Sequence, residues 1–289
     1  MPRKMRMKKS TMIKRIITTL YFMYVIFMTS FGEVYSAEWD CASSTNTGTF
    51  TRSTGCMIYT SHVAVSNTLA INGTNTDMNN LITISAYSRK RHFYLNDANA
   101  KLILRYLKLI GGDVSSYRYN PDKLGGSICI FSNGGELNLY SSIVFNNKAK
   151  YGGGIYAHGG SNTNKNTIVN IYNSIIQNNK ANCLGGGTCS GGGIYIAYGA
   201  VATIETTTID NNQVSGSYNN GGGMVIVSSN VVSSDVTMRY TIISNNDASG
   251  ASSRGGGFYI NGASTYILSK CSDFDRRKSG LYFQYTINS

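Results

Sequence analysis

Side chains that could carry out acid–base chemistry are few in this sequence and widely scattered. Charged residues make up 14% of the 289 residues. Cleavage of a sugar chain generally needs two carboxylates that face each other across the scissile bond. The candidates follow no common spacing, and we assign no catalytic residue. They are Glu136, Glu205, Asp210, Asp235 and Asp247.

Metal-ligating residues are equally dispersed. The three histidines, His62, His92 and His158, lie far apart in the sequence, and we interpret each as structural. No run of aspartates resembles a Ca²⁺-binding turn, and no histidine or cysteine pair has the spacing of zinc ligands. The sequence therefore predicts neither a metal site nor a cofactor.

A single repeated pattern supplies the structural elements that hold these side chains. Its first half ends in two asparagines, and its second half is a glycine run followed by a short apolar strand, as in GGGIYAH from Gly152. The second asparagines follow each other at 32, 33 and 34 residues, which indicates a solenoid. The first halves are LNLYSSIVFNNKA from Leu137, VNIYNSIIQNNKA from Val169, ATIETTTIDNNQV from Ala202 and VTMRYTIISNNDA from Val236.

Apolar residues within each copy mostly alternate with period two, which is typical of strands with one buried face. Triple glycine would weaken a helix by roughly 1 kcal/mol per residue, and no 3.6-residue stripe compensates. We therefore predict an all-β protein, a single-stranded parallel β-helix with coils of about 33 residues. Aliphatic residues at matching positions extend the stack back to Ile71 and Leu104.

Identical positions in successive coils lie about 4.8 Å apart, so inward polar residues should form columns. Gly112 stands at the asparagine position one coil earlier, so the asparagine ladder should begin at Asn147. A hydroxyl column should run beside it. The two structural ladders are Asn147, Asn179, Asn212 and Asn246, and Ser142, Ser174, Thr207 and Thr241.

An aliphatic residue three positions before the asparagine recurs in all four copies, as at Val144 and Ile176. A GG-x-I motif follows it, with Met224 and Phe258 in place of the isoleucine in the last two copies. This pattern resembles the repeats of polymorphic outer-membrane proteins and of pectate-lyase-like β-helices. The resemblance covers about Leu102 to Ile260 and implies a right-handed coil, which the spacing itself does not show.

In the glycine-led strands, Tyr156, Tyr195 and Tyr259 should point outward in one exposed column. Such a column could stack on carbohydrate or contact a surface protein, or it could only stiffen the sheet. The column that contains Asp210 reads Phe145, Gln177, Asp210 and Ser244, without a second carboxylate.

The N-terminus has the layout of a secretory signal peptide over residues 1–36. Seven basic residues precede 17 uncharged residues from Ile16 to Gly32, and small residues follow. This segment is expected to form an N-terminal signal helix, and an uncleaved membrane anchor is the alternative to a cleaved signal peptide. Without this segment the net charge falls from +12 to +6, with 19 basic and 13 acidic residues, and no basic stripe predicts nucleic-acid binding.

Residues 37–60 lack the repeat and are predicted to form an N-terminal cap closed by a Cys41–Cys56 disulfide, before a repeat domain at 61–289. A local Cys183–Cys189 disulfide is expected as well, which leaves Cys129 and Cys271. Asn72 begins the single N-glycosylation sequon.

These features favour a secreted or cell-surface protein without catalytic activity that has an adhesion or scaffolding role. Its partners would be carbohydrate or surface proteins, with the membrane involved only if the N-terminal segment is retained. The alternative is a polysaccharide lyase or a glycoside hydrolase of the pectate-lyase-like fold.

Overall fold

The computed structural model describes residues 36–42, 46–116, 123–160, 167–183, 187–229, 232–250, 252–262, 265–269 and 281–284. The predicted signal segment, apart from Ser36, and Cys271 lie outside these residues. The chain divides into two units, Met1–Ser36 and Ala37–Ser289. Within the described ranges, all regular elements are β-strands and no helix could cross a membrane.

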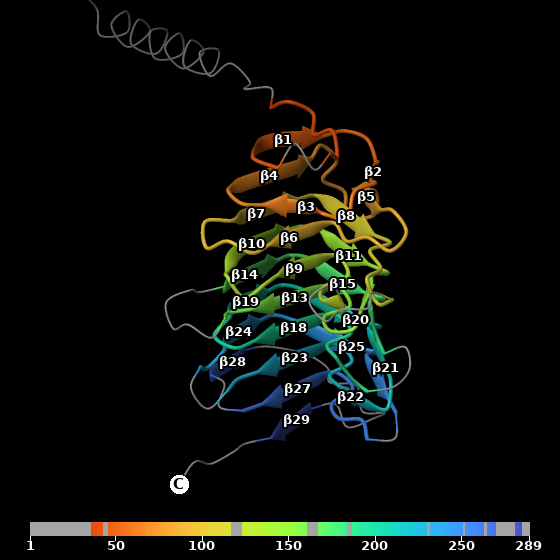
Figure 1. The fold of residues 1–289 in the computed structure, drawn as a ribbon, viewed down its shortest axis with the longest axis vertical. Coiled ribbons are helices and arrows are strands. Elements are labelled where there is room, and N and C mark those ends of the chain that lie inside the picture. The colour runs from red at the N-terminus through yellow and green to blue at the C-terminus, as the bar shows by residue number, and fades with distance from the viewer. Residues whose placement is uncertain are drawn as a thin grey trace, which may run out of the picture. The chain divides into compact units, whose positions relative to one another are not determined.

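The second unit is a parallel β-solenoid whose strands stack in chain order (Figure 1). Its described residues form three long sheets, one on each side of the coil. Sheet A contains β1 (Gly48–Arg52), β4 (Thr68–Gly73), β7 (Lys101–Arg105), β10 (Gly135–Tyr140), β14 (Thr167–Tyr172), β19 (Val201–Glu205), β24 (Asp235–Arg239) and β28 (Thr265–Ser269). Sheet B contains β2 (Cys56–Ile58), β5 (Ile82–Ala86), β8 (Leu107–Ile110), β11 (Ile143–Phe145), β15 (Ile175–Gln177), β20 (Thr208–Asp210) and β25 (Ile242–Ser244). Sheet C contains β3 (Val63–Val65), β6 (Phe93–Leu95), β9 (Ile128–Ile130), β13 (Ile155–His158), β18 (Ile194–Ala197), β23 (Met224–Val227), β27 (Phe258–Asn261) and β29 (Leu281–Gln284).

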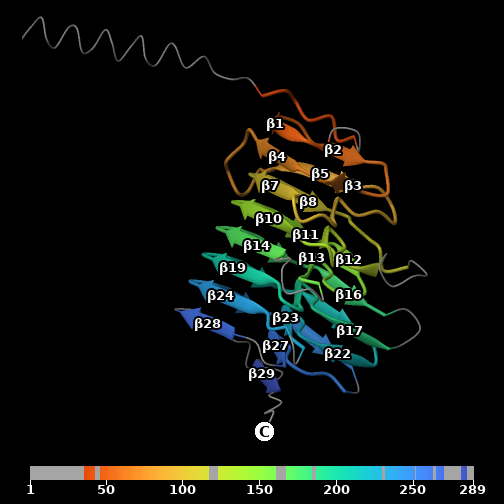
Figure 2. The ribbon, with the colours of Figure 1, turned by 60° about the vertical axis from the view of Figure 1, so that its left-hand side comes forward.

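Two smaller sheets lie beside this stack and were not foreseen as strands (Figure 2). They form in the interval between the ladder asparagine and the glycine run. Sheet D contains β12 (Lys148–Ala149), β16 (Lys180–Asn182), β21 (Gln213–Ser215) and β26 (Asp247–Ser249), and sheet E contains β17 (Thr188–Ser190) and β22 (Tyr218–Asn220).

The strand pairing confirms the register expected from the repeat. Leu139 of β10 lies opposite Leu104 and Ile171, and Ile204 lies opposite Met238. These side chains are fully buried in one continuous apolar core. The alternation of apolar and polar residues therefore fixes which face of every strand points inward.

Left-handed backbone at the corners explains the asparagines and glycines. The first asparagine of each pair has a φ between 49° and 57°, a conformation that asparagine tolerates better than most residues. Gly191 has a φ of 65°. Gly192 beside it has no room for a side chain, because a Cβ there would collide with the carbonyl oxygen of Gly222 in the next coil.

The predicted cap is part of the stack. β1 and β2 lie within residues 37–60, yet they pair in parallel with β4 and β5. The segment before them closes the end of the core, where Trp39 is fully buried with its ring 5.8 Å from that of Phe93. The first coil therefore begins inside the segment predicted to be a cap.

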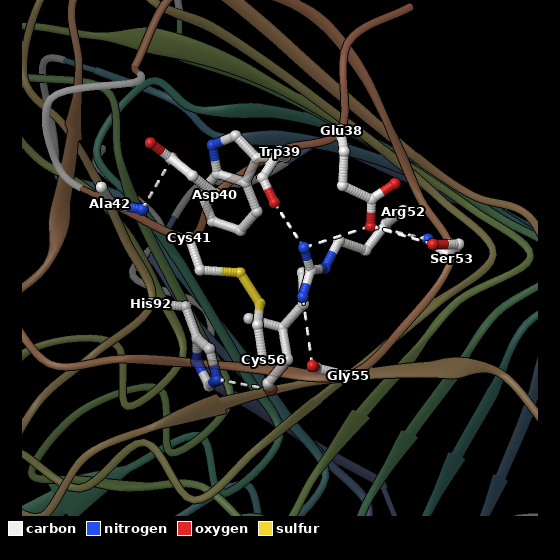
Figure 3. The surroundings of a disulfide bond; sticks show 11 residues. Glu38, Trp39, Asp40, Cys41, Ala42, Arg52, Ser53, Gly55, Cys56 and His92 are labelled. Atoms are coloured by element: carbon white, nitrogen blue, oxygen red, sulfur yellow. Dashed lines mark hydrogen bonds and ion pairs between the residues drawn. A yellow bond between two sulfur atoms is a disulfide. The ribbon is translucent and has the colours of Figure 1, made fainter.

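A buried arginine joins the closing segment to the first coil (Figure 3). The Arg52 guanidinium donates to the carbonyl oxygens of Trp39 and Gly55 at 2.5 and 3.1 Å, and it pairs with Glu38 at 3.2 Å. The predicted Cys41–Cys56 disulfide is present beside it.

Candidate binding groove

The predicted tyrosine column lies on the outer face of sheet C. Tyr156 is opposite Tyr195, Tyr195 is opposite Val225, and Val225 is opposite Tyr259. The rings of Tyr156 and Tyr195 stack with centroids 5.3 Å apart and planes 12° from parallel. These residues belong to hydrophobic clusters outside the main core, as expected for outward side chains.

The expectation that this column is exposed is wrong. Tyr156 and Tyr259 are 6% and 4% exposed, and Tyr195 is partly buried. Leu124 and Tyr151 pack against the column, and residues of sheet E line the same groove beside it. The repeat pattern predicts no strands in the intervals that hold these segments. It therefore gives no reason to expect a wall beside the column, which Thr188, Ser190 and Asn220 form.

Column and wall enclose a groove of about 610 Å³. Its floor is the outer face of sheet C, from the β9 rung to β27. The groove contains five tyrosines and one phenylalanine, with four hydroxyl or amide side chains among them. The aromatic residues are Phe131, Tyr151, Tyr156, Tyr195, Tyr198 and Tyr259, and the polar ones are Thr188, Ser190, Asn220 and Asn261.

The polar wall is organised by the second predicted disulfide. Cys183 and Cys189 are bonded, and Cys189 is fully buried against Ala181, Val214 and Ala248. Because side chains alternate along a strand, this burial turns the neighbouring Thr188 and Ser190 of β17 toward the groove. Ser190 lies opposite Asn220 of β22, which continues the wall.

The repeat pattern identifies three of the groove residues, Tyr156, Tyr195 and Tyr259, and does not point to the others. Tyr151, which directly precedes a glycine run, and Tyr198, which follows the strand IYIA, lie beside repeat landmarks and could have been noticed. Nothing in the spacing points to Thr188 or Asn220, because the pairing of β17 with β22 brings them to the groove.

Both phenols of the stacked pair remain protonated at neutral pH. Burial raises the pKa of Tyr156 and of Tyr195, and neighbouring tyrosines raise them further. His158 contacts Tyr198 with ring centroids 4.9 Å apart, and burial lowers its pKa below the usual value. Lys150 lies over the ring of Tyr151 at 5.2 Å but is not among the residues that line the groove.

The asparagine ladder is confirmed as a buried structural element. In each step, the backbone N–H and the side-chain Nδ2 of one asparagine donate to Oδ1 of the next at 2.9–3.0 Å. The ladder runs from Asn147 to Asn246, and Asn147 accepts from the backbone of Gly112. The asparagines therefore hold the coils together and do not face the groove.

The hydroxyl column is buried as well. Ser142, Ser174, Thr207 and Thr241 each donate to the carbonyl oxygen two residues earlier, at 2.7–3.1 Å. Ser142 and Ser174 also accept a backbone N–H from the preceding coil. These hydroxyls stabilise the corner between sheets A and B.

The five candidate carboxylates lie on three different sheets. Glu136, Glu205 and Asp235 are in sheet A, Asp210 is in sheet B and Asp247 is in sheet D. Burial acts to raise the pKa of Asp210, but hydrogen bonds from Asn245, Gln177 and Ser244 outweigh it and lower the pKa. Glu136 is paired with Lys101 at 2.9 Å.

The three histidines have separate surroundings. His92 is fully buried, with Nε2 3.1 Å from the carbonyl oxygen of Ile84 and Nδ1 3.0 Å from the Ser127 hydroxyl. Burial lowers its pKa to about 4. The ring of His62 lies 5.0 Å from that of Tyr94. Within the described ranges, no three metal-ligating side chains form a cluster.

The sequon residue Asn72 is half-buried, and Cys129, which the predicted disulfides leave over, is buried. Asn72 lies within β4, where its amide donates to Phe50 on one side and accepts from Arg105 on the other. The side-chain amide of the sequon asparagine therefore forms hydrogen bonds to both neighbouring strands. Cys129 is a buried free thiol in sheet C, and burial raises its pKa to about 11.

Comparisons of the chain with protein-family models, with curated proteins and with solved structures found no match.

Proposed function

We propose that this chain is an exported, non-catalytic surface or extracellular-matrix protein that uses the groove on sheet C for adhesion or scaffolding. The groove carries the proposal, because a concave site lined by aromatic side chains and a few polar groups is typical of ligand binding. The same proposal includes a right-handed coil. It also includes a family relationship to pectate-lyase-like β-helices and to the repeats of polymorphic outer-membrane proteins.

The alternative function, cleavage of a polysaccharide, would need two carboxylates at one site. None of the five candidate acids lines the groove, and Asp210 already accepts three hydrogen bonds from side chains. We therefore favour binding without turnover.

The test incubates the mature chain with acidic and neutral polysaccharides and measures binding and new chain ends in parallel. We expect binding without new ends, weakened at least tenfold by Tyr156→Leu with Tyr195→Leu. Leucine keeps apolar volume but removes the stacking rings and the hydroxyl groups. The matched control is Tyr140→Leu with Tyr172→Leu, since these rings also stack, 5.4 Å apart, on the outer face of sheet A.

Turnover that disappears in Asp210→Asn would overturn the proposal in favour of the enzyme. Equal loss of binding in both double variants would place the contact surface outside the groove.

A further inference from the structure

We infer that the ligand of the groove is a neutral, linear glycan, an inference that rests on the proposed function. Three properties of the groove carry it. These are a gap in the tyrosine column, the lack of charge in the lining, and the placement of polar groups along one wall.

The gap lies at Val225. Tyr195 and Tyr259 occupy the same column two rungs apart, which corresponds to roughly 9.5 Å at the usual strand spacing. Valine is the short side chain between them, and Val225 and Val227 both line the groove there. Val225 is itself only 1% exposed, so the floor between the two tyrosine rings is a closed apolar surface, and a puckered sugar ring can pack over it.

The lining is uncharged in the part of the chain that the structure describes. No Asp, Glu, Lys, Arg or His is among its residues, and the two stacked phenols keep their protons. Recognition of a carboxylate or sulfate group normally uses Arg or Lys. A uronic-acid or sulfated polymer would therefore find no counter-charge in this groove, whereas a neutral sugar needs none.

The polar groups match a ligand that carries many hydroxyls. Thr188, Ser190 and Asn220 line the wall, and Asn261 lies at the end of the floor strand β27. Hydroxyl and amide groups both donate and accept, so they can pair with sugar hydroxyls in either direction. The groove also extends over several rungs, from Phe131 to Asn261, which fits an extended chain better than a single small molecule.

The experiment titrates the mature chain calorimetrically with neutral hexasaccharides, namely cellohexaose, laminarihexaose and mannohexaose, and with hexagalacturonate and a proline-rich peptide. We expect at least one neutral hexasaccharide to bind at least tenfold more tightly than hexagalacturonate. Its affinity should change less than twofold between 50 and 500 mM NaCl, because no ion pair forms.

Two substitutions locate the site. Val225→Phe places a bulkier side chain between Tyr195 and Tyr259 on the groove floor and should lower affinity for the neutral glycan at least tenfold. Val201→Phe, the same change on the outer face of sheet A, should leave that affinity unchanged. Thr188→Lys adds a charge at an exposed wall position and should strengthen only hexagalacturonate binding. Because Thr188 is exposed, this variant tests the groove even if Val225→Phe fails to fold.

Groove-dependent binding of hexagalacturonate or of the peptide would overturn the neutral-glycan inference and leave the adhesion proposal standing. Absence of binding to all three neutral hexasaccharides by the folded chain would also overturn it. Release of new chain ends from a bound neutral glycan would instead refute the non-catalytic function and leave the ligand class intact.

Discussion

At the scale of single residues, the fold depends on buried amides that form hydrogen bonds to the neighbouring coils. Asn179 illustrates this, because its Oδ1 accepts both the backbone N–H and the Nδ2 of Asn147. Its own Nδ2 donates to Oδ1 of Asn212 and to the carbonyl oxygen of Val144. Each rung of the ladder therefore satisfies polar groups in both adjacent coils.

Asn179→Leu should remove the acceptor for two donors of Asn147 and lower the free energy of unfolding by about 1 to 3 kcal/mol. Lys180→Ala at the next position is the control and should have a much smaller effect. Denaturant titration of the two variants measures the difference, and equal midpoints would contradict the role of the ladder.

Thr206 is a second informative residue, because it has a φ of 50° at an exposed corner. A β-branched side chain is unfavourable there by roughly 1 to 2 kcal/mol, and the preceding coil has asparagine, Asn173, at the same place. Thr206→Asn should raise the free energy of unfolding by about 0.5 to 1 kcal/mol. Thr208→Asn in β20 should not stabilise the protein, and a gain of the same size in both variants would contradict this explanation.

The buried imidazole of His92 should make stability depend on pH. Its pKa is about 4 in the folded chain, whereas the unfolded chain takes up the same proton near the ordinary value of 6.5. The stabilisation is therefore complete above pH 6.5 and is lost as the pH falls toward 4, by roughly 3 kcal/mol in total.

His92→Gln should remove most of this slope in denaturant titrations between pH 4 and 7. His158→Gln should remove a smaller part, because His158 is only partly buried and its pKa is lowered in the same direction. An unchanged slope in His92→Gln would show that other groups dominate acid unfolding.

At the scale of elements, the two disulfides have different tasks. Cys41–Cys56 joins the closing segment to the first coil, while Cys183–Cys189 supports the strand that carries the groove wall. Their sequence separations of 15 and 6 residues correspond to about 3 and about 2 kcal/mol of unfolded-state entropy.

Replacing Cys41 and Cys56 by serine should lower the denaturation midpoint and leave binding in the groove unchanged. Replacing Cys183 and Cys189 should lower the midpoint less but weaken binding severalfold, because β17 is no longer held. Calorimetric titration and denaturation of both double variants distinguish the two effects. A loss of binding only in the first variant would contradict this assignment.

At the scale of the whole molecule, the coils of the described solenoid share one apolar core. The buried side chain of Trp39 closes this core at its N-terminal end. Export is a prediction that rests on residues 1–36, and almost all of this segment lies outside the described residues. N-terminal sequencing of exported material should find a mature chain that begins near Ala37. A chain that begins at Met1 would favour the retained anchor.

The parallel solenoid, the inward faces of its strands, the asparagine ladder and both disulfide pairs could be predicted from the sequence. Each of these follows from local periodicity or from residues close together in the chain, as with Cys183 and Cys189. In a solenoid, residues one repeat apart in the sequence stack on each other. The contact between Asn147 and Asn179 could therefore be predicted from the repeat length.

The covering of the tyrosines and the position of the groove depend on contacts between segments that are far apart in the sequence. Tyr195 points outward by strand alternation, but its burial depends on neighbours outside its own column, such as Tyr151, whose ring lies 5.6 Å away. Thr188 reaches the groove because β17 pairs with β22 of the next coil. Such pairing between irregular intervals has no period in the sequence, and the accessibility of an outward side chain is therefore set by its three-dimensional neighbours.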